Sequence, residues 1–172
     1  MGLTKVRAAG ITTGIGTKEI VTLSGSDTGI TGITTTWEYL NFKVIDLSSA
    51  ASSTLRLQLG NSSGYVTSGY EVDSTYINNS GGGAYGAGGF SDTGGFSIGN
   101  WGASTVHNIV GNFNKEKDTN QVAGYLFNSL AGGTYQGIQL VSGKVTIANI
   151  DRIRFISSSG DFDGGKLSIT YF

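Results

Sequence analysis

Cysteine and proline are both absent from this chain of 172 residues, and histidine occurs once, at His107. Without cysteine there is no disulfide, no thiolate nucleophile and no thiolate ligand for a metal. With a single histidine, the side chain that most often shuttles protons or binds zinc at neutral pH is nearly missing. We therefore expect a protein that is not an enzyme and that holds neither a metal nor a cofactor.

Charged residues are also scarce, because they make up 13% of the chain and leave a net charge of -1. A protein that binds nucleic acid needs a basic face that releases counterions from phosphates, and so small and balanced a set of charges does not supply one. No run of roughly 20 apolar residues could span a bilayer, and no signal peptide is recognisable. We expect neither a nucleic-acid partner nor membrane insertion.

Glycine, by contrast, contributes 29 residues, and serine, threonine and asparagine are abundant. Without proline, turns must be made by glycine and by side chains that bond their own backbone. A chain of this length fits one domain with a real core. The composition therefore favours many short strands within a single sandwich or barrel.

Several segments alternate apolar and polar residues with the period of two that is typical of a half-buried strand. The segments WEYLNFKVIDL and STLRLQLG, separated by the turn-like SSAASS, predict two strands that form a hairpin. Further strands are predicted near residues 70–77, 96–98, 105–113, 122–127, 135–141, 152–156 and 166–171. The residues expected in the core are Leu40, Phe42, Val44, Leu55, Leu57, Leu59, Ile153, Phe155, Leu167 and Ile169.

This pattern predicts an all-β fold, an antiparallel two-sheet jelly-roll sandwich that spans residues 17–172. Residues 1–16 lack a sustained period and have little large apolar surface, so we interpret them as a short extended N-terminal arm. Along this arm, Leu3, Val6 and Ile11 could lie in a neighbouring protein's groove or add an edge strand. We expect the arm to attach the domain to a larger assembly.

The segment 78–102 is rich in glycine and still carries the large aromatic residues Tyr85, Phe90 and Trp101. Ordering glycine costs backbone entropy, so an ordered segment of this kind usually has a partner packed on it. We expect a long exposed loop interrupted by one short strand at Phe96. Its aromatic residues either stack on the sugar rings of a ligand or anchor the loop on this subunit or the next.

Two short patterns match functional motifs without the structural context that those motifs need. Residues Gly95–Gly99 read G-x-S-x-G around Ser97, but a nucleophile elbow requires a helix after the serine, and none is predicted. Residues 81–86 read G-x-G-x-x-G, but no βαβ unit supplies a helix N-terminus for a pyrophosphate. Both patterns are interpreted as products of the glycine-rich composition.

The remaining candidate residues do not form a recognisable metal-binding or catalytic pattern either. Asp161 and Asp163 have oxygens for calcium, but the complete ligand loop is missing, and aspartate near glycine commonly makes a turn. His107 lies in a strand-like segment, where alternation either groups it with Ile109 and Phe113 or sends it outward opposite Val106 and Val110. It is interpreted as structural. A polysaccharide hydrolase needs two carboxylates facing one another, and no spacing selects a pair among Glu38, Asp46, Glu71 and Asp73.

The segments WEYLNFKVIDL, GYVTSGY and GDFDGGKLSITYF, with the strand end LQLG at Leu57–Gly60, resemble the jelly-roll domains of tail-fibre and other surface proteins of tailed phages. The resemblance covers roughly residues 37–172. Near the C-terminus, Phe162 and Asp163 lie one place earlier relative to Gly160 than in the common form of the family. None of these motifs is catalytic.

The resemblance implies a structural protein on the surface of a phage virion, as a tail fibre, a ring-forming tail component or a head-decoration protein. It also implies that the partners are other virion proteins and, by analogy with fibre heads, that the chain forms a homotrimer. An alternative is a module that binds a host receptor or surface glycan through residues 78–102. A polysaccharide hydrolase is the third hypothesis.

Overall fold

The computed structural model describes residues 16–79, 85–103, 105–116, 119–131 and 136–172. The described residues form no helix long and apolar enough to cross a membrane. They contain thirteen β-strands: β1 Thr17–Thr22, β2 Asp27–Thr31, β3 Tyr39–Ser49, β4 Ser53–Asn61, β5 Gly64–Tyr65, β6 Glu71–Asn79, β7 Tyr85–Asp92, β8 Phe96–Trp101, β9 Val106–Lys115, β10 Gln121–Ala131, β11 Gln136–Thr146, β12 Arg152–Ser157 and β13 Phe162–Tyr171.

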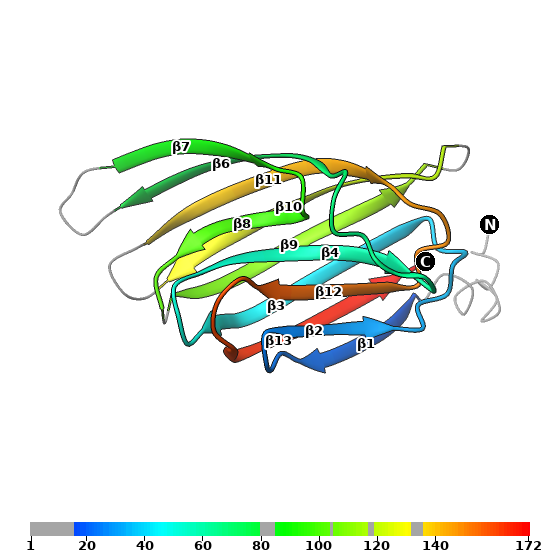
Figure 1. Cartoon of the computed structure of the whole chain (residues 1–172), viewed down its shortest axis with the longest axis horizontal. Coiled ribbons are helices and arrows are strands. Elements are labelled where there is room, and N and C mark those ends of the chain that lie inside the picture. The colour runs from blue at the N-terminus through cyan, green and yellow to red at the C-terminus, as the bar shows by residue number, and fades with distance from the viewer. Residues whose placement is uncertain (1–15, 80–84, 104, 117–118, 132–135) are drawn as a thin grey trace, which may run out of the picture.

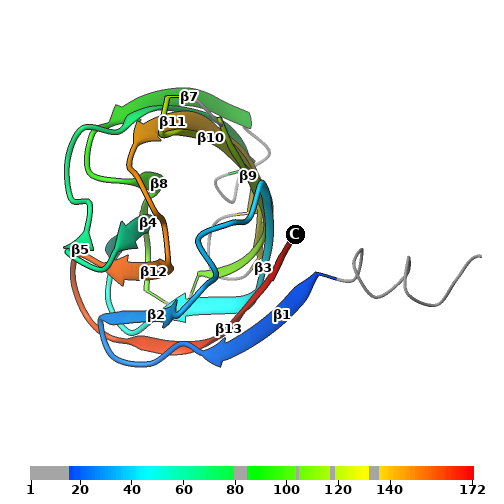
Figure 2. The same ribbon diagram turned by 90° about the vertical axis from the view of Figure 1, so that its right-hand side faces the viewer.

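The strands form two antiparallel sheets (Figure 1). The larger sheet has eight strands in the order β1-β13-β3-β9-β10-β11-β6-β7. The smaller sheet has the order β2-β12-β4-β5, and β8 pairs with β4 as its fifth strand. Viewed along the strands, the larger sheet curves around the smaller one, so that its outer face is convex (Figure 2). The expected all-β sandwich of two packed sheets, similar to a jelly roll, is confirmed.

The core lies between the two sheets and follows from the alternation of side chains along each strand. All ten residues predicted for the core are buried. The rings of Phe42 and Phe113 stack with centroids 5.3 Å apart, and Phe96 meets Phe113 edge-on at 4.9 Å. Trp37 is also buried and donates a hydrogen bond of 3.2 Å from its Nε1 to the carbonyl of Ile150.

The predicted hairpin of β3 and β4 is wrong. Strand β3 pairs with β13 and β9 in the larger sheet, whereas β4 pairs with β12, β5 and β8 in the smaller one. Alternation requires only that one face of each strand be buried, and two strands on opposite sheets meet that requirement by facing each other across the core. The short serine-rich segment therefore crosses between sheets.

The expectation of a long exposed loop over residues 78–102 is also wrong. Most of this segment forms β7 and β8, which belong to different sheets. Glycine is tolerated in β7 because neighbouring groups lie close to the backbone: a Cβ at Gly88 would come within 2.7 Å of Cζ of Tyr76. At Gly89, a Cβ would lie 2.6 Å from the carbonyl oxygen of Ser74. Close cross-strand packing takes the place of the missing side chains.

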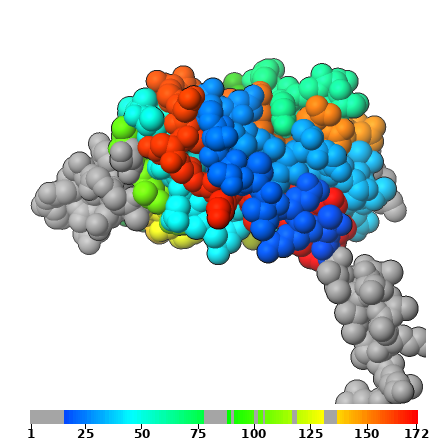
Figure 3. All heavy atoms as spheres, turned by 90° about the horizontal axis from the view of Figure 1, so that it is seen from below, coloured from blue at the N-terminus to red at the C-terminus, as the bar shows by residue number. Residues whose placement is uncertain are grey.

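The first and last strands of the described fold lie side by side. Strand β1 pairs with β13 along its whole length, from Thr17 opposite Tyr171 to Thr22 opposite Lys166. Figure 3 shows the N-terminal strands in blue against the C-terminal strands in red. The hydroxyl of Tyr171 donates to Oε1 of Glu19 at 3.0 Å. The larger sheet is therefore completed only when both β1 and β13 are in place.

Candidate functional site: the outer face of the larger sheet

The outer face of the larger sheet carries large apolar side chains that no other part of the described structure covers. They lie on β6, β9, β10 and β11, and each is between 39% and 51% exposed. We call them the apolar patch; its members are Ile77, Val110, Tyr125, Phe127, Ile138 and Leu140. Isolated exposed hydrophobic residues are normal on a protein surface, but a contiguous group marks an interaction site.

Strand register makes the patch contiguous. Phe127 is paired with Val110 on one side and with Leu140 on the other, so three apolar residues form one row across the sheet. In the next row, Ile138 is paired with Ile77. Directly paired residues on one face of a sheet have Cβ atoms about 5 Å apart, so these side chains touch their neighbours. The patch is therefore a single surface.

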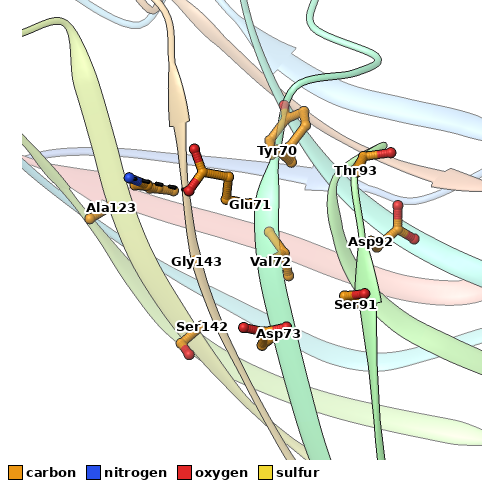
Figure 4. A pocket seen from close by; sticks show the side chains of 11 residues that line it. Tyr70, Glu71, Val72, Asp73, Ser91, Asp92, Thr93, Ala123, Ser142 and Gly143 are labelled. Carbon is orange, nitrogen blue, oxygen red and sulfur yellow. Dashed lines mark ion pairs between the residues drawn. The ribbon is translucent and has the colours of Figure 1, made fainter.

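A hollow of about 510 Å³ adjoins the patch on the same sheet. Its lining includes the small residues Ala123 and Ser142 and the acidic residues Glu71 and Asp73 (Figure 4). Nζ of Lys144 lies 3.2 Å from Oε2 of Glu71, and the two side chains are 42% and 74% exposed. An ion pair of this kind is screened and holds its partners weakly, so these groups are available to a ligand.

The chemistry of the hollow suits hydrogen bonding to a polar ligand. Carboxylates accept, the ammonium of Lys144 donates, and the hydroxyl of Ser142 does both. Tyr125 is paired with Ser142 across β10 and β11 and is 48% exposed, so an aromatic ring stands beside the polar groups. An apolar ring face next to hydrogen-bonding groups is the combination that a sugar ring requires.

The residues that the sequence indicated for ligand binding are not gathered in one loop. Tyr85 and Phe90 belong to β7 in the larger sheet, and Trp101 ends β8 in the smaller one. Tyr85 is paired with Asn79 and Phe90 with Ser74. The residues indicated for attachment, Leu3, Val6 and Ile11, lie outside the described residues.

The pattern G-x-S-x-G forms part of strand β8 and not a turn into a helix. Ser97 is buried, and its hydroxyl oxygen accepts a hydrogen bond of 3.2 Å from the backbone nitrogen of Gly99. A serine nucleophile must instead be exposed at a sharp strand-to-helix turn. The geometry of Ser97 therefore differs from that of a nucleophile elbow.

His107 lies inside the sandwich, at the end of a line of polar side chains that crosses four strands of the larger sheet. Its Nδ1 is 3.0 Å from Nδ2 of Asn128, which in turn is 3.4 Å from Oε1 of Gln139. Nε2 of Gln139 donates to the hydroxyl of Ser74 at 3.2 Å. Burial lowers the pKa of His107 to about 4, so the ring is neutral at neutral pH.

The acidic residues considered for metal binding or hydrolysis are dispersed. Asp163 accepts a hydrogen bond from the hydroxyl of Ser48, which fixes its carboxylate at the start of β13. Within the described ranges, no group of three or more histidine, aspartate and glutamate side chains is placed to hold a metal ion. Only Glu71 and Asp73, of the four carboxylates considered for hydrolysis, lie together, on the rim of the hollow.

Sequence reasoning missed the apolar patch, although a signal was present. In β10, Val122 and Leu126 point into the core, while Tyr125 and Phe127 point outward. Strand β11 likewise buries Val141 and exposes Ile138 and Leu140. A strand with one face in water has polar residues on that face, so apolar residues on both faces indicate a second buried surface.

Comparisons with known proteins identify no family for this chain. No family model matches, and no curated protein matches. Solved structures with a similar course of the chain include the SPBc2 prophage-derived protein YomS, at 11% identity over 92% of this chain and 96% of that one, with a TM-score of 0.33. Galectin LEC-6 of Caenorhabditis elegans matches at 11% identity over 87% and 94%, with a TM-score of 0.38.

A sialidase module of Ruminococcus gnavus, CBM40, bound to α2,3-sialyllactose, matches at 10% identity over 91% of this chain and 90% of that one, with a TM-score of 0.34. These similar structures thus include a prophage-derived protein, a galectin and a sialidase module with a bound glycan. Such similarities are too low to assign a role to any residue of this chain.

Proposed function

We propose that this chain is a structural component of a phage virion, displayed on the particle surface, that works by surface contact and not by bond chemistry. The observation that carries the proposal is the apolar patch. Six large side chains lie side by side on the outer face of a sheet, where water would otherwise cover them. Burying such surface against a partner stabilises the assembly by about 25 cal/mol for each Å² removed from water.

The sequence resemblance to surface proteins of tailed phages supports the virion as the setting. In this proposal, residues 17–172 form the domain that contacts other copies or other virion proteins, and residues 1–16 form the attachment arm. Leu3, Val6 and Ile11 supply the apolar contacts of the arm. The trimeric state implied by the resemblance stays a prediction.

Incorporation into particles tests the proposal. Phage particles are purified from cells in which the chain is supplied as wild type or as the double variant Phe127→Ser with Leu140→Ser. We expect the double variant to fold normally, because both side chains are exposed, and to be lost from particles. Ile20→Ser is the matched control, since Ile20 is 60% exposed on β1 and lies outside the patch. Particles that never contain the wild-type chain would contradict the proposed role.

Glycan binding is the second candidate function, and the hollow beside Tyr125 favours it. Calorimetric titration of host surface polysaccharide should give a saturable signal that Tyr125→Ala and Asp73→Ala both weaken. The triple variant Tyr85→Ala, Phe90→Ala and Trp101→Ala separates this site from the one indicated by the sequence. If only the triple variant loses binding, the glycan site lies on β7 and β8 and not in the hollow.

A further inference from the structure

We propose that the apolar patch binds the same patch on a second copy of this chain, with a two-fold axis parallel to the strands and above β10. This inference rests on the proposed function and names the partner of the surface. A closed two-fold contact uses one surface patch twice, so the patch must be complementary to itself. The register of the larger sheet meets this condition.

Strand order places β10 in the middle of the patch, between β9 and β11 and then between β3 and β6. A two-fold axis above β10 therefore lays β9 of one copy on β11 of the other. In the row of Phe127, this places Val110 on Leu140 and Phe127 beside its own copy. Apolar residues meet apolar residues.

The same two-fold rotation also places polar residues of one copy opposite polar residues of the other. Asn112 is paired with Tyr125, and Tyr125 with Ser142, so Asn112 of one copy faces Ser142 of the other while Tyr125 lies next to its own copy. An axis perpendicular to the strands and through the row of Phe127 would instead place Ile138 over Ser142. That axis puts an apolar side chain on a polar one, so the strand-parallel axis is the one that fits.

The area available indicates a weak dimer. The six residues of the patch expose on the order of 500 Å² per copy, at the level that marks interaction sites. Two such surfaces bury roughly 1,000 Å², at the low end of specific interfaces, and the convex shape of the face concentrates contact on the central strands (Figure 2). Such a dimer would be stabilised further by the high local concentration within a particle.

Sedimentation velocity of the full chain, at loading concentrations from about 1 to about 200 µM, measures the association. We expect a monomer–dimer equilibrium for the wild type and for Ile20→Ser. Phe127→Ser with Leu140→Ser should give a monomer. Val110→Asp and Leu140→Lys should each raise the dimer dissociation constant by roughly tenfold or more, because each places two charges against apolar side chains of the other copy.

Mixing the two charge variants is the decisive measurement. In a mixed dimer, the carboxylate of the Val110→Asp protomer faces the ammonium of the Leu140→Lys protomer, and the second contact still places Val110 on Leu140. One contact is then an ion pair and the other is apolar, so neither leaves a charge against an apolar side chain. We expect the mixture to recover the wild-type dissociation constant, although each variant alone does not. A simple loss of folding in either variant cannot produce this recovery.

Failure of this inference is distinguishable from failure of the proposed function. A wild-type chain that stays monomeric, sediments as a trimer, or shows no recovery on mixing would overturn the two-fold contact. If the Phe127 and Leu140 double variant is nevertheless lost from particles, the patch binds a different virion protein and the proposed function stands. If wild type and double variant enter particles equally, the patch has no role in assembly.

Discussion

At the scale of single residues, a hydrogen bond from Asn128 on the inner face of the larger sheet determines the protonation state of His107. The amide nitrogen of Asn128 only donates, so Nδ1 of His107 accepts, and the ring is neutral with its proton on Nε2. Protonating the ring would place two donors face to face in a buried site. The fold therefore opposes the charged form of this histidine.

We expect this histidine to make the folded state less stable in mild acid. The pKa of His107 is about 4 in the folded protein against 6.5 for the ordinary side chain, so between these values the unfolded chain binds a proton that the folded chain does not. The free energy of unfolding should fall through this window by about 3 kcal/mol at most and level off below it. Urea unfolding across the window measures the loss. His107→Gln should flatten the profile, and an unchanged slope would contradict the assignment.

A second residue-scale prediction concerns a glycine beneath an aromatic ring. A Cβ at Gly124 would lie 2.6 Å from the carbonyl oxygen of Asn112 and would collide with the ring of Phe113, which Phe42 and Phe96 hold in place. We expect Gly124→Ala to destabilise the fold by about 1–3 kcal/mol in urea unfolding. Gly102→Ala is the control, because the nearest atom to its added Cβ is 3.9 Å away. Equal stabilities for the two variants would count against this packing argument.

At the scale of secondary-structure elements, one carboxylate joins the two sheets at the link between β7 and β8. Oδ2 of Asp92 lies 2.8 Å from Nε of Arg56 on β4, and its Oδ1 accepts from the backbone nitrogen of Gly94 at 2.6 Å. The side chain of Gln58 donates to the carbonyl of Gly94 at 2.6 Å. The turn is thus held from the smaller sheet.

We expect Asp92→Asn to loosen this link while the rest of the sandwich stays folded. Loss of the charge weakens both hydrogen bonds and should cost about 1–2 kcal/mol. Amide hydrogen exchange should rise in β7 and β8 and remain unchanged in β3 and β13. Asp161→Asn is the control, since its side chain is exposed on the turn before β13. Uniform acceleration of exchange in all strands would show that Asp92 supports the whole fold instead.

At the scale of the whole molecule, the pairing of β1 with β13 joins the two ends of the described fold. Deleting residues 1–15 should leave the melting temperature unchanged, because the sequence of this segment has little large apolar surface and we interpret it as an arm outside the domain. Deleting residues 1–22 also removes β1 and exposes the edge of β13. It uncovers the part of the hydrophobic core against which Val21 packs. We expect a lower melting temperature and aggregation at that new edge. Scanning calorimetry with light scattering compares the two truncations, and equal behaviour would contradict the role of β1.

The sequence alone determined the all-β class, most of the strands and the core, because alternation is local: a side chain two residues along the strand points to the same face. It placed Leu40, Leu57 and Phe155 inside without knowledge of their neighbours. The same locality explains the errors. Alternation does not identify the partner of a strand, so β3 and β4 were expected in one hairpin although they belong to opposite sheets.

Tertiary structure alone decided the candidate site. Ile77 and Ile138 are far apart in the sequence, and only the pairing of β6 with β11 makes them neighbours. Glycine-rich β7 likewise became a strand because β6 offered backbone partners along its length. The pairing of strands that are distant in the sequence depends on how all the strands pack into the two sheets, so it is a property of the whole chain. The sequence therefore determined which residues are buried, and the fold determined which exposed residues form one surface.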